Sequence, residues 1–182
     1  MRRGQLEHVL RAASQIIGER DLLVVGSAAI LGTYDEDALP PAATRSDEAD
    51  LAPFKDPDGS RSMAIEGSLG SGSMFHETYG YFADGVDLGT AIVPPGWRER
   101  LVLFDTEGTQ PGRGWCLERH DLAVSKLIAG RPKDYEFVDA LLEAGLLDLE
   151  LLRQRFDALP RDRAIPAFAA KAERWLRSRP RT

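Results

Sequence analysis

Two carboxylates one residue apart are the strongest candidates for chemistry in this chain. They belong to the segment Ser46-Asp47-Glu48-Ala49-Asp50-Leu51. Alternate residues of a β-strand point to the same side, so Glu48 and Asp50 would project together on a strand. Hard oxygen ligands of this kind suit Mg²⁺, which usually takes one or two carboxylates together with substrate phosphates. The alternative interpretation is a solvated acidic turn that binds nothing.

A glycine-serine pair, Gly26-Ser27, follows the apolar run over residues 21–25 and precedes the apolar residues 28–31. This pattern predicts a buried strand, a tight turn and the start of a helix. Backbone N–H groups at a helix N-terminus bind phosphate, and a glycine allows the phosphate to approach closely. A plain turn without a ligand is the alternative for the same pair.

A third carboxylate is expected from one of two positions further along the chain. Asp87 lies between Val86 and Leu88 in a β-type run, where it would either face solvent or join the acidic pair. Asp84 competes for this role, but its neighbour Gly85 is typical of a hairpin. We therefore expect Asp87 to complete the set.

The elements that would position these residues follow from the hydrophobic periodicity. Strands are expected over residues 21–25, 46–52, 79–83, 86–88, 91–93 and 101–106. Helices are expected over residues 4–19, 121–129, 133–145 and 164–178, with two more beginning near residues 28 and 148. Residues 62–74 give a mixed signal, because their glycines weaken any regular element. The pattern indicates an α/β (α+β) fold, in which helices flank a mixed sheet and a C-terminal helical region follows.

Charge divides the chain near residue 118. Residues 1–118 carry 10 basic and 19 acidic side chains, for a net charge of −9. Residues 119–182 carry 13 basic and 10 acidic side chains, for a net charge of +3. We expect an α/β domain over 1–118 and a helical region over 119–182 that packs on it. The acidic first part argues against a protein that simply coats nucleic acid, and it permits a divalent-metal site.

The composition excludes several classes of protein. With 43% apolar and 29% charged residues, the chain is typical of a folded globular protein rather than a disordered one. No apolar run approaches the ~20 residues of a membrane span, and the first residues do not read as a signal peptide. The single cysteine, Cys116, excludes an internal disulfide framework and a cysteine-based zinc site. We therefore expect a cytoplasmic protein with no membrane partner.

The strand-glycine-serine-helix pattern, the acidic strand and the later acidic residue together resemble the polymerase-β-type nucleotidyltransferase superfamily. The helical part strengthens the resemblance. Its segment Asp121-Leu-Ala-Val-Ser-Lys-Leu-Ile-Ala-Gly-Arg-Pro-Lys-Asp134 is similar to the Asp-Leu-x-x-x-Lys-Leu-x-Ala-x-Arg-x-Lys-Asp stretch of small bacterial nucleotidyltransferase-like proteins. These proteins include uncharacterised families and relatives of the abortive-infection AbiE-type toxin nucleotidyltransferases. The resemblance covers most of the chain, over residues 20–150.

The resemblance implies a function of the following kind. A Mg²⁺-dependent enzyme would move a nucleotidyl group from an NTP to a hydroxyl on a small molecule, an RNA end or a protein. The nucleotide would be the first partner, and Mg²⁺ the cofactor. The alternative is a protein that keeps this fold without catalysis and acts as a binding module or in a toxin–antitoxin pair.

The resemblance also implies roles for individual residues. The implied metal-binding and catalytic residues are Glu48, Asp50 and Asp87. The implied nucleotide-binding residues are Gly26, Ser27 and Lys126. For Lys126, a solvent-facing lysine on an amphipathic helix is the alternative. The family pattern has Asp at the position of Glu48, so the longer side chain displaces its carboxylate by about one methylene, which a strictly octahedral Mg²⁺ tolerates poorly.

Overall fold

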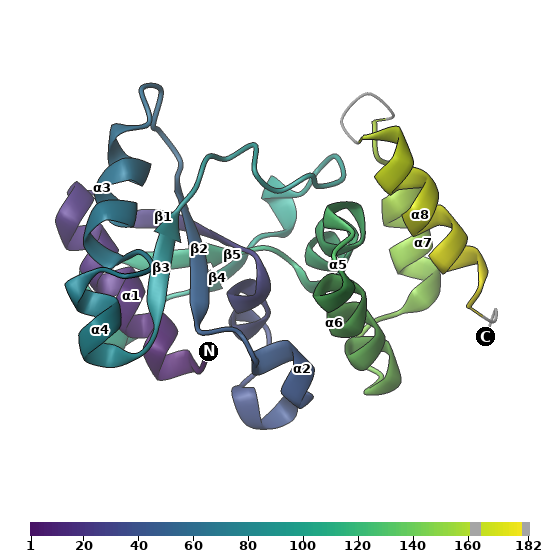
Figure 1. The fold of residues 1–182 in the computed structure, drawn as a ribbon, viewed down its shortest axis with the longest axis horizontal. Helices are drawn as coiled ribbons and strands as arrows, with labels where there is room; N and C mark the ends of the chain where they lie inside the picture. The colour runs from purple at the N-terminus through teal and green to yellow at the C-terminus, as the bar shows by residue number, and fades with distance from the viewer. Residues whose placement is uncertain (161–164, 180–182) are drawn as a thin grey trace.

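The computed structural model describes residues 1–160 and 165–179. It contains a five-stranded sheet flanked by helices and followed by a helical region (Figure 1), which confirms the predicted fold class. The strands are β1 (Asp21–Val25), β2 (Glu48–Pro53), β3 (Phe82–Gly85), β4 (Val102–Phe104) and β5 (Arg113–Cys116). The α-helices are α1 (Arg3–Ile17), α2 (Pro41–Thr44), α3 (Ser60–Leu69), α4 (Met74–Tyr79), α5 (Arg119–Ala129), α6 (Pro132–Glu143), α7 (Leu149–Asp157) and α8 (Pro166–Arg177).

The sheet has the strand order β3-β2-β1-β5-β4. Parallel pairing joins β2 to β3 and β1 to β5, whereas β1–β2 and β4–β5 are antiparallel. The sheet is therefore mixed, as predicted, and β1 lies at its centre. Four of the five residues of β1 are buried, which agrees with the continuous apolar run in the sequence.

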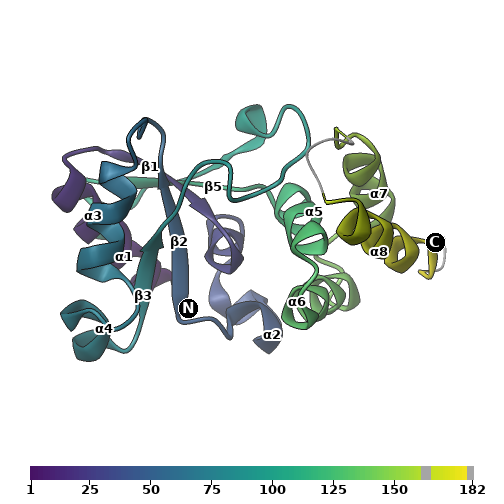
Figure 2. The ribbon, with the colours of Figure 1, turned by 45° about the horizontal axis from the view of Figure 1, so that its top comes forward.

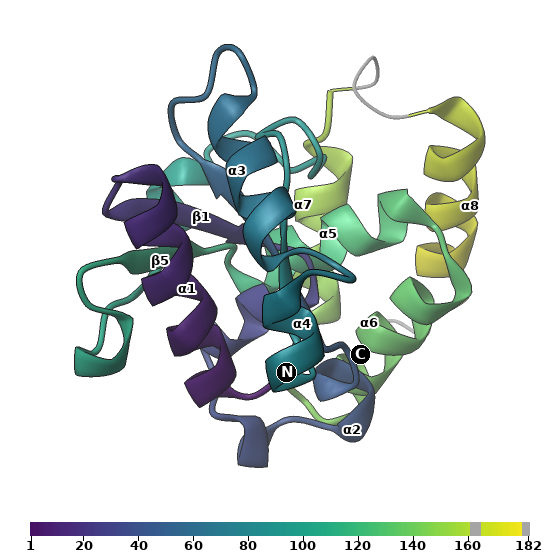
Figure 3. The ribbon, with the colours of Figure 1, turned by 60° about the vertical axis from the view of Figure 1, so that its left-hand side comes forward.

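Alternation along β2 separates an apolar face from an acidic face. Ala49 and Leu51 are fully buried, and they share a face with Gly85 of β3. A Cβ at Gly85 would lie 1.9 Å from the carbonyl oxygen of Ser62, so the glycine lets α3 pack directly on the strand. Helices α1, α3 and α4 cover this side of the sheet (Figure 3). Acidic residues of β2 alternate with these apolar ones, so they point to the opposite side.

The helical region lies beside the other side of the sheet (Figure 2). Its central element is α5, which contacts α6, α7 and α8 and also packs on the short 3-10 helix Ser27–Gly32 that follows β1. Leu122 and Leu127 of α5 are fully buried. Helices are present where the sequence predicts them after residue 119, although position 164 of the last predicted helix lies outside the described residues.

The structure differs from the local predictions in several places. The segment 62–74, which gave a mixed signal, contains most of α3 and the first residue of α4, because Gly67 lies on the exposed side of α3, and the chain between the two helices contains the other two glycines. The apolar runs at 86–88 and 91–93 are not strands, and β5 was not predicted. After Gly26 the chain forms a helix, as predicted, and this helix is of the 3-10 kind.

No helix within residues 1–160 and 165–179 combines the length and apolar character needed to cross a membrane.

Candidate functional site

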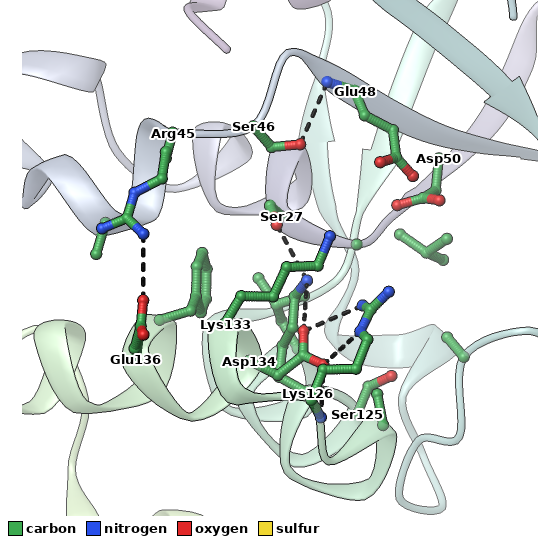
Figure 4. Close-up of a pocket in the computed structure, with 18 of the residues that line it drawn as sticks. Ser27, Arg45, Ser46, Glu48, Asp50, Ser125, Lys126, Lys133, Asp134 and Glu136 are labelled. Atoms are coloured by element: carbon green, nitrogen blue, oxygen red, sulfur yellow. Dashed lines mark hydrogen bonds and ion pairs between the residues drawn. The ribbon is translucent and has the colours of Figure 1, made fainter. Parts of the chain in front are cut away.

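A cavity of about 330 Å³ opens between the sheet and the helical region (Figure 4). The end of β1, the turn after it, and the start of β2 form one wall. Helices α5 and α6 form the opposite wall. The sheet wall carries the carboxylates of Glu48 and Asp50, whereas the helical wall carries three cations, Lys126, Arg131 and Lys133. The cavity therefore has an acidic side and a basic side that face each other.

The turn after β1 lies directly against the Asp50 carboxylate. Val25, the last residue of β1, is the register partner of Asp50 in β2. Gly26 follows with φ 62° and ψ −163°, a conformation that is essentially restricted to glycine. A Cβ at this position would lie 1.8 Å from Asp50 Oδ2. A side chain on residue 26 would therefore collide with the carboxylate.

Glu48 and Asp50 form an acidic pair on one side of β2. Burial, followed by repulsion from the neighbouring Glu48 carboxylate, raises the pKa of Asp50 to about 7. The Lys126 ammonium across the cavity opposes this rise. Two carboxylates this close resist simultaneous ionisation unless a cation lies nearby. The pair is therefore the part of the cavity that fits a cation.

The register places Asp84, not Asp87, beside this pair. Asp84 of β3 is the partner of Asp50 in the parallel β2–β3 ladder, so both side chains point to the same side. Its Oδ1 atom is buried and has no hydrogen-bond partner among the described residues. Burial, followed by repulsion from Glu66 and Glu48, raises the pKa of Asp84 to about 6.

Asp87 does not join the acidic pair. Strand β3 ends at Gly85, and Asp87 lies exposed in the segment that follows. Its carboxylate accepts a hydrogen bond from the backbone N–H of Gly89 at 2.6 Å, and it does not line the cavity. The expectation that Asp87 completes the set is therefore corrected, because β3 ends two residues before Asp87 and the register places Asp84 beside Asp50 instead.

Three carboxylates on one sheet face do not yet form a complete coordination shell. Among residues 1–160 and 165–179, no group of three or more His, Cys, Asp or Glu side chains is arranged to hold one metal ion. A Mg²⁺ ion usually takes only one or two protein carboxylates and completes its shell with water and substrate phosphates. Glu48 and Asp50 meet that requirement and both line the cavity, whereas Asp84 lies beside Asp50 without being part of the lining.

Lys126 reaches the cavity from the buried side of α5. The residue is 7% exposed, which rules out the solvent-facing alternative. Its Nζ atom donates to Ser27 Oγ at 3.0 Å and lies 3.3 Å from Asp134 Oδ1. Burial lowers the pKa of Lys126, and the Asp134 carboxylate opposes that shift. Lys126 therefore joins the helical wall to the turn after β1, as Figure 4 shows.

Asp134, the last residue of the segment that carries the family resemblance, is also a member of the site. It is fully buried in the first turn of α6, where it accepts hydrogen bonds from Arg131 Nε at 2.7 Å and Arg131 Nη2 at 3.1 Å. The break at Gly130 turns the chain so that α6 starts beside the end of α5. Asp134 lies eight positions after Lys126 in the sequence, and this turn brings their side chains together.

Charged groups also surround the mouth of the cavity. Arg45, just after α2, donates to Glu136 of α6 at 3.1 Å, and both side chains are mostly exposed. The Lys133 side chain extends into the cavity from the start of α6 (Figure 4). A site with carboxylates on one side and cations on the other suits an anionic substrate that binds together with a divalent cation.

Comparison with known proteins agrees with this geometry. Searches of curated proteins and of solved structures give no match. A family model described as a nucleotidyltransferase of unknown function (DUF6036) matches residues 4–163, which contain every residue of the cavity. The chain therefore belongs to this nucleotidyltransferase family.

Proposed function

We propose that this protein transfers a nucleotidyl group from a nucleoside triphosphate to a hydroxyl acceptor, with Mg²⁺ as the cofactor. The observation that carries the proposal is the cavity itself, in which the acidic pair of β2 faces the cations of α5 and α6. A nucleotide with its triphosphate bound as a Mg²⁺ complex is complementary to both walls. Membership of a nucleotidyltransferase family supports the same reaction class.

The transfer exchanges one phosphorus–oxygen bond for another. The acceptor oxygen attacks the α-phosphorus, the bond from that phosphorus to the oxygen bridging the β-phosphate breaks, and pyrophosphate leaves. Gly26 and Ser27 would bind the triphosphate at the turn after β1, where the serine hydroxyl lies beside Lys126 and the glycine leaves room for the Asp50 carboxylate. Glu48 and Asp50 would hold the cation, which neutralises the charge that develops on the transferred and leaving groups.

The proton of the acceptor hydroxyl also needs a base. Asp84 is suited to that role because it lies on the same side of the sheet as Asp50. Its Oδ1 atom is buried without a hydrogen-bond partner among the described residues, although Asp84 lies next to the cavity lining rather than on it. Asp84 would receive the proton as the acceptor oxygen attacks.

Calorimetry with four nucleotides tests the proposal. ATP, GTP, CTP and UTP are titrated, with and without Mg²⁺, into the wild type and the Asp50→Ala variant. Asp139→Asn is the matched control, because Asp139 lies on α6, forms an ion pair with Arg179 and does not line the cavity. We expect at least one nucleotide to bind more tightly with Mg²⁺, and we expect Asp50→Ala alone to remove that enhancement.

Two results would contradict parts of the proposal. If no nucleotide binds the wild type, the proposed reaction is wrong. If a nucleotide binds equally well without Mg²⁺ and without the Asp50 carboxylate, the metal assignment is wrong. Release of pyrophosphate from the bound nucleotide, measured with small-molecule alcohols and RNA as acceptors, then separates an enzyme from a non-catalytic binding or toxin–antitoxin module. The module would bind nucleotide without releasing pyrophosphate.

A further inference from the structure

The Asp134 carboxylate joins two cations of the helical wall. Its Oδ1 atom contacts Lys126 Nζ at 3.3 Å and Arg131 Nη2 at 3.1 Å, and its Oδ2 atom accepts from Arg131 Nε at 2.7 Å. Oδ2 also accepts from the backbone N–H of Arg131 at 3.2 Å. One anion therefore holds two cations, and the group keeps a net positive charge beside the cavity.

Burying such a group is costly, so packing alone does not account for it. Lys126 and Asp134 are 7% and 0% exposed, and a buried ion pair often stabilises a protein less than apolar residues of the same volume. The group also lies on the cavity wall, where its charge faces Glu48 and Asp50. These features indicate that the arrangement serves a ligand rather than stability.

The hydrogen bonds to Asp134 leave part of each cation available. Nε and Nη2 of Arg131 are engaged along one edge of the guanidinium group, whereas Nη1 has no partner among the described residues. The Arg131 side chain is 55% exposed and lines the cavity. Lys126 uses two of its three N–H groups, on Ser27 and Asp134. A planar guanidinium held along one edge is preorganised to bind phosphate oxygens with the other.

We propose that Asp134 is a positioning residue that holds Lys126 and Arg131 as a pair of binding groups for the pyrophosphate portion of the nucleotide. This inference rests on the proposed function. Arg131 becomes a substrate-binding residue, and Asp134 acts through it and through Lys126. The pair binds the β- and γ-phosphates before transfer and the pyrophosphate product afterwards. The site consequently discriminates a nucleoside triphosphate from the corresponding monophosphate.

Calorimetry tests this inference by measuring the affinity of each variant for three ligands. These are inorganic pyrophosphate, the nucleoside triphosphate that binds the wild type, and the corresponding monophosphate. Asp134→Asn keeps the side-chain size but removes the charge, whereas Arg131→Lys keeps the charge but removes the planar fork. Asp139→Asn again removes an aspartate–arginine pair from α6 outside the cavity. Thermal melting shows whether each variant is folded.

We expect Asp134→Asn and Arg131→Lys each to weaken binding of pyrophosphate and of the triphosphate by about tenfold or more, the effect of losing a charge-assisted hydrogen bond. Monophosphate binding should change by less than about twofold, and Asp139→Asn should change none of the three affinities. A purely structural role for Asp134 would weaken all ligands alike, which would overturn the inference.

Two further outcomes separate this inference from its premise. If the wild type binds a triphosphate with Mg²⁺ but Arg131→Lys binds it equally well, the inference is wrong and the proposed function stands. If the wild type binds neither nucleotide nor pyrophosphate, both are wrong. Arg131→Lys leaves the buried Asp134 with a cation beside it, so the test remains decisive even where Asp134→Asn fails to fold.

Discussion

Gly26→Ala measures how closely the turn after β1 approaches the acidic pair. The variant places alanine in a backbone conformation reserved for glycine, which costs about 1–3 kcal/mol. Its Cβ would also lie 1.8 Å from Asp50 Oδ2, so the carboxylate or the turn must shift, at a further cost of about 1–3 kcal/mol. We expect the free energy of unfolding to fall by about 2–6 kcal/mol in urea titrations followed by tryptophan fluorescence.

A double-mutant cycle separates the two contributions. Asp50→Ala removes the clashing oxygen and leaves Cβ, which lies 3.5 Å from the added methyl group, an ordinary contact distance. In the Asp50→Ala background, Gly26→Ala should lower the unfolding free energy only by the cost of the strained backbone conformation. Gly145→Ala is a second control, because Gly145 has φ 69° with nothing within 4 Å of its would-be Cβ. If Gly26→Ala lowers the unfolding free energy equally with and without the Asp50 carboxylate, the close approach of the turn to this carboxylate is refuted.

Three further perturbations test other parts of the structure. The pKa of Asp50 is about 7 in the folded protein and 3.8 in its ordinary state, so the stabilisation from its bound proton is lost as pH rises through 7. In metal-free buffer, Asp50→Asn should flatten the fall in unfolding free energy between about pH 4 and 7, by about 1.4 kcal/mol per pH unit, and an unchanged slope would contradict this. Arg100→Ala should lower the unfolding free energy by about 2–4 kcal/mol, because it leaves the fully buried Asp121 carboxylate with only the more distant Arg155, whose Nε lies 3.8 Å from Asp121 Oδ1. Arg177→Ala, which breaks an exposed pair, should cost about 0.5 kcal/mol or less, and similar losses for the two variants would argue against the buried pair. Burial raises the pKa of the Cys116 thiol to about 12, so a thiol reagent should label this residue only at the rate of unfolding, and rapid labelling of the native protein would show that the core is open there.

The third carboxylate shows where pattern reasoning reached its limit. Asp87 sits in an apolar-acidic-apolar run that is typical of a strand, whereas Asp84 is followed by a glycine that indicates a hairpin. In the structure that glycine is the last residue of β3, where it provides the space against which Ser62 of α3 packs. The glycine thus reflects a contact between two elements, which no local pattern distinguishes from a turn.

Local sequence determined the elements that carry the site. The apolar run of β1, the alternation of Glu48 and Asp50, and the helical periodicity after residue 119 all depend on residues near one another in the chain, so each was predictable. The acidic pair and the glycine-serine turn were identified for the same reason.

Only the tertiary structure decided which side chains face each other across the cavity. The β2–β3 register places Asp84 beside Asp50, and the turn between α5 and α6 places Asp134 against Lys126 and Arg131. Register and helix packing are set by the burial of many apolar side chains at once, so they depend on the whole core rather than on any segment. Local pattern therefore indicated the acidic pair, but only the fold placed Asp84 beside it and supplied the anion that holds the opposing cations.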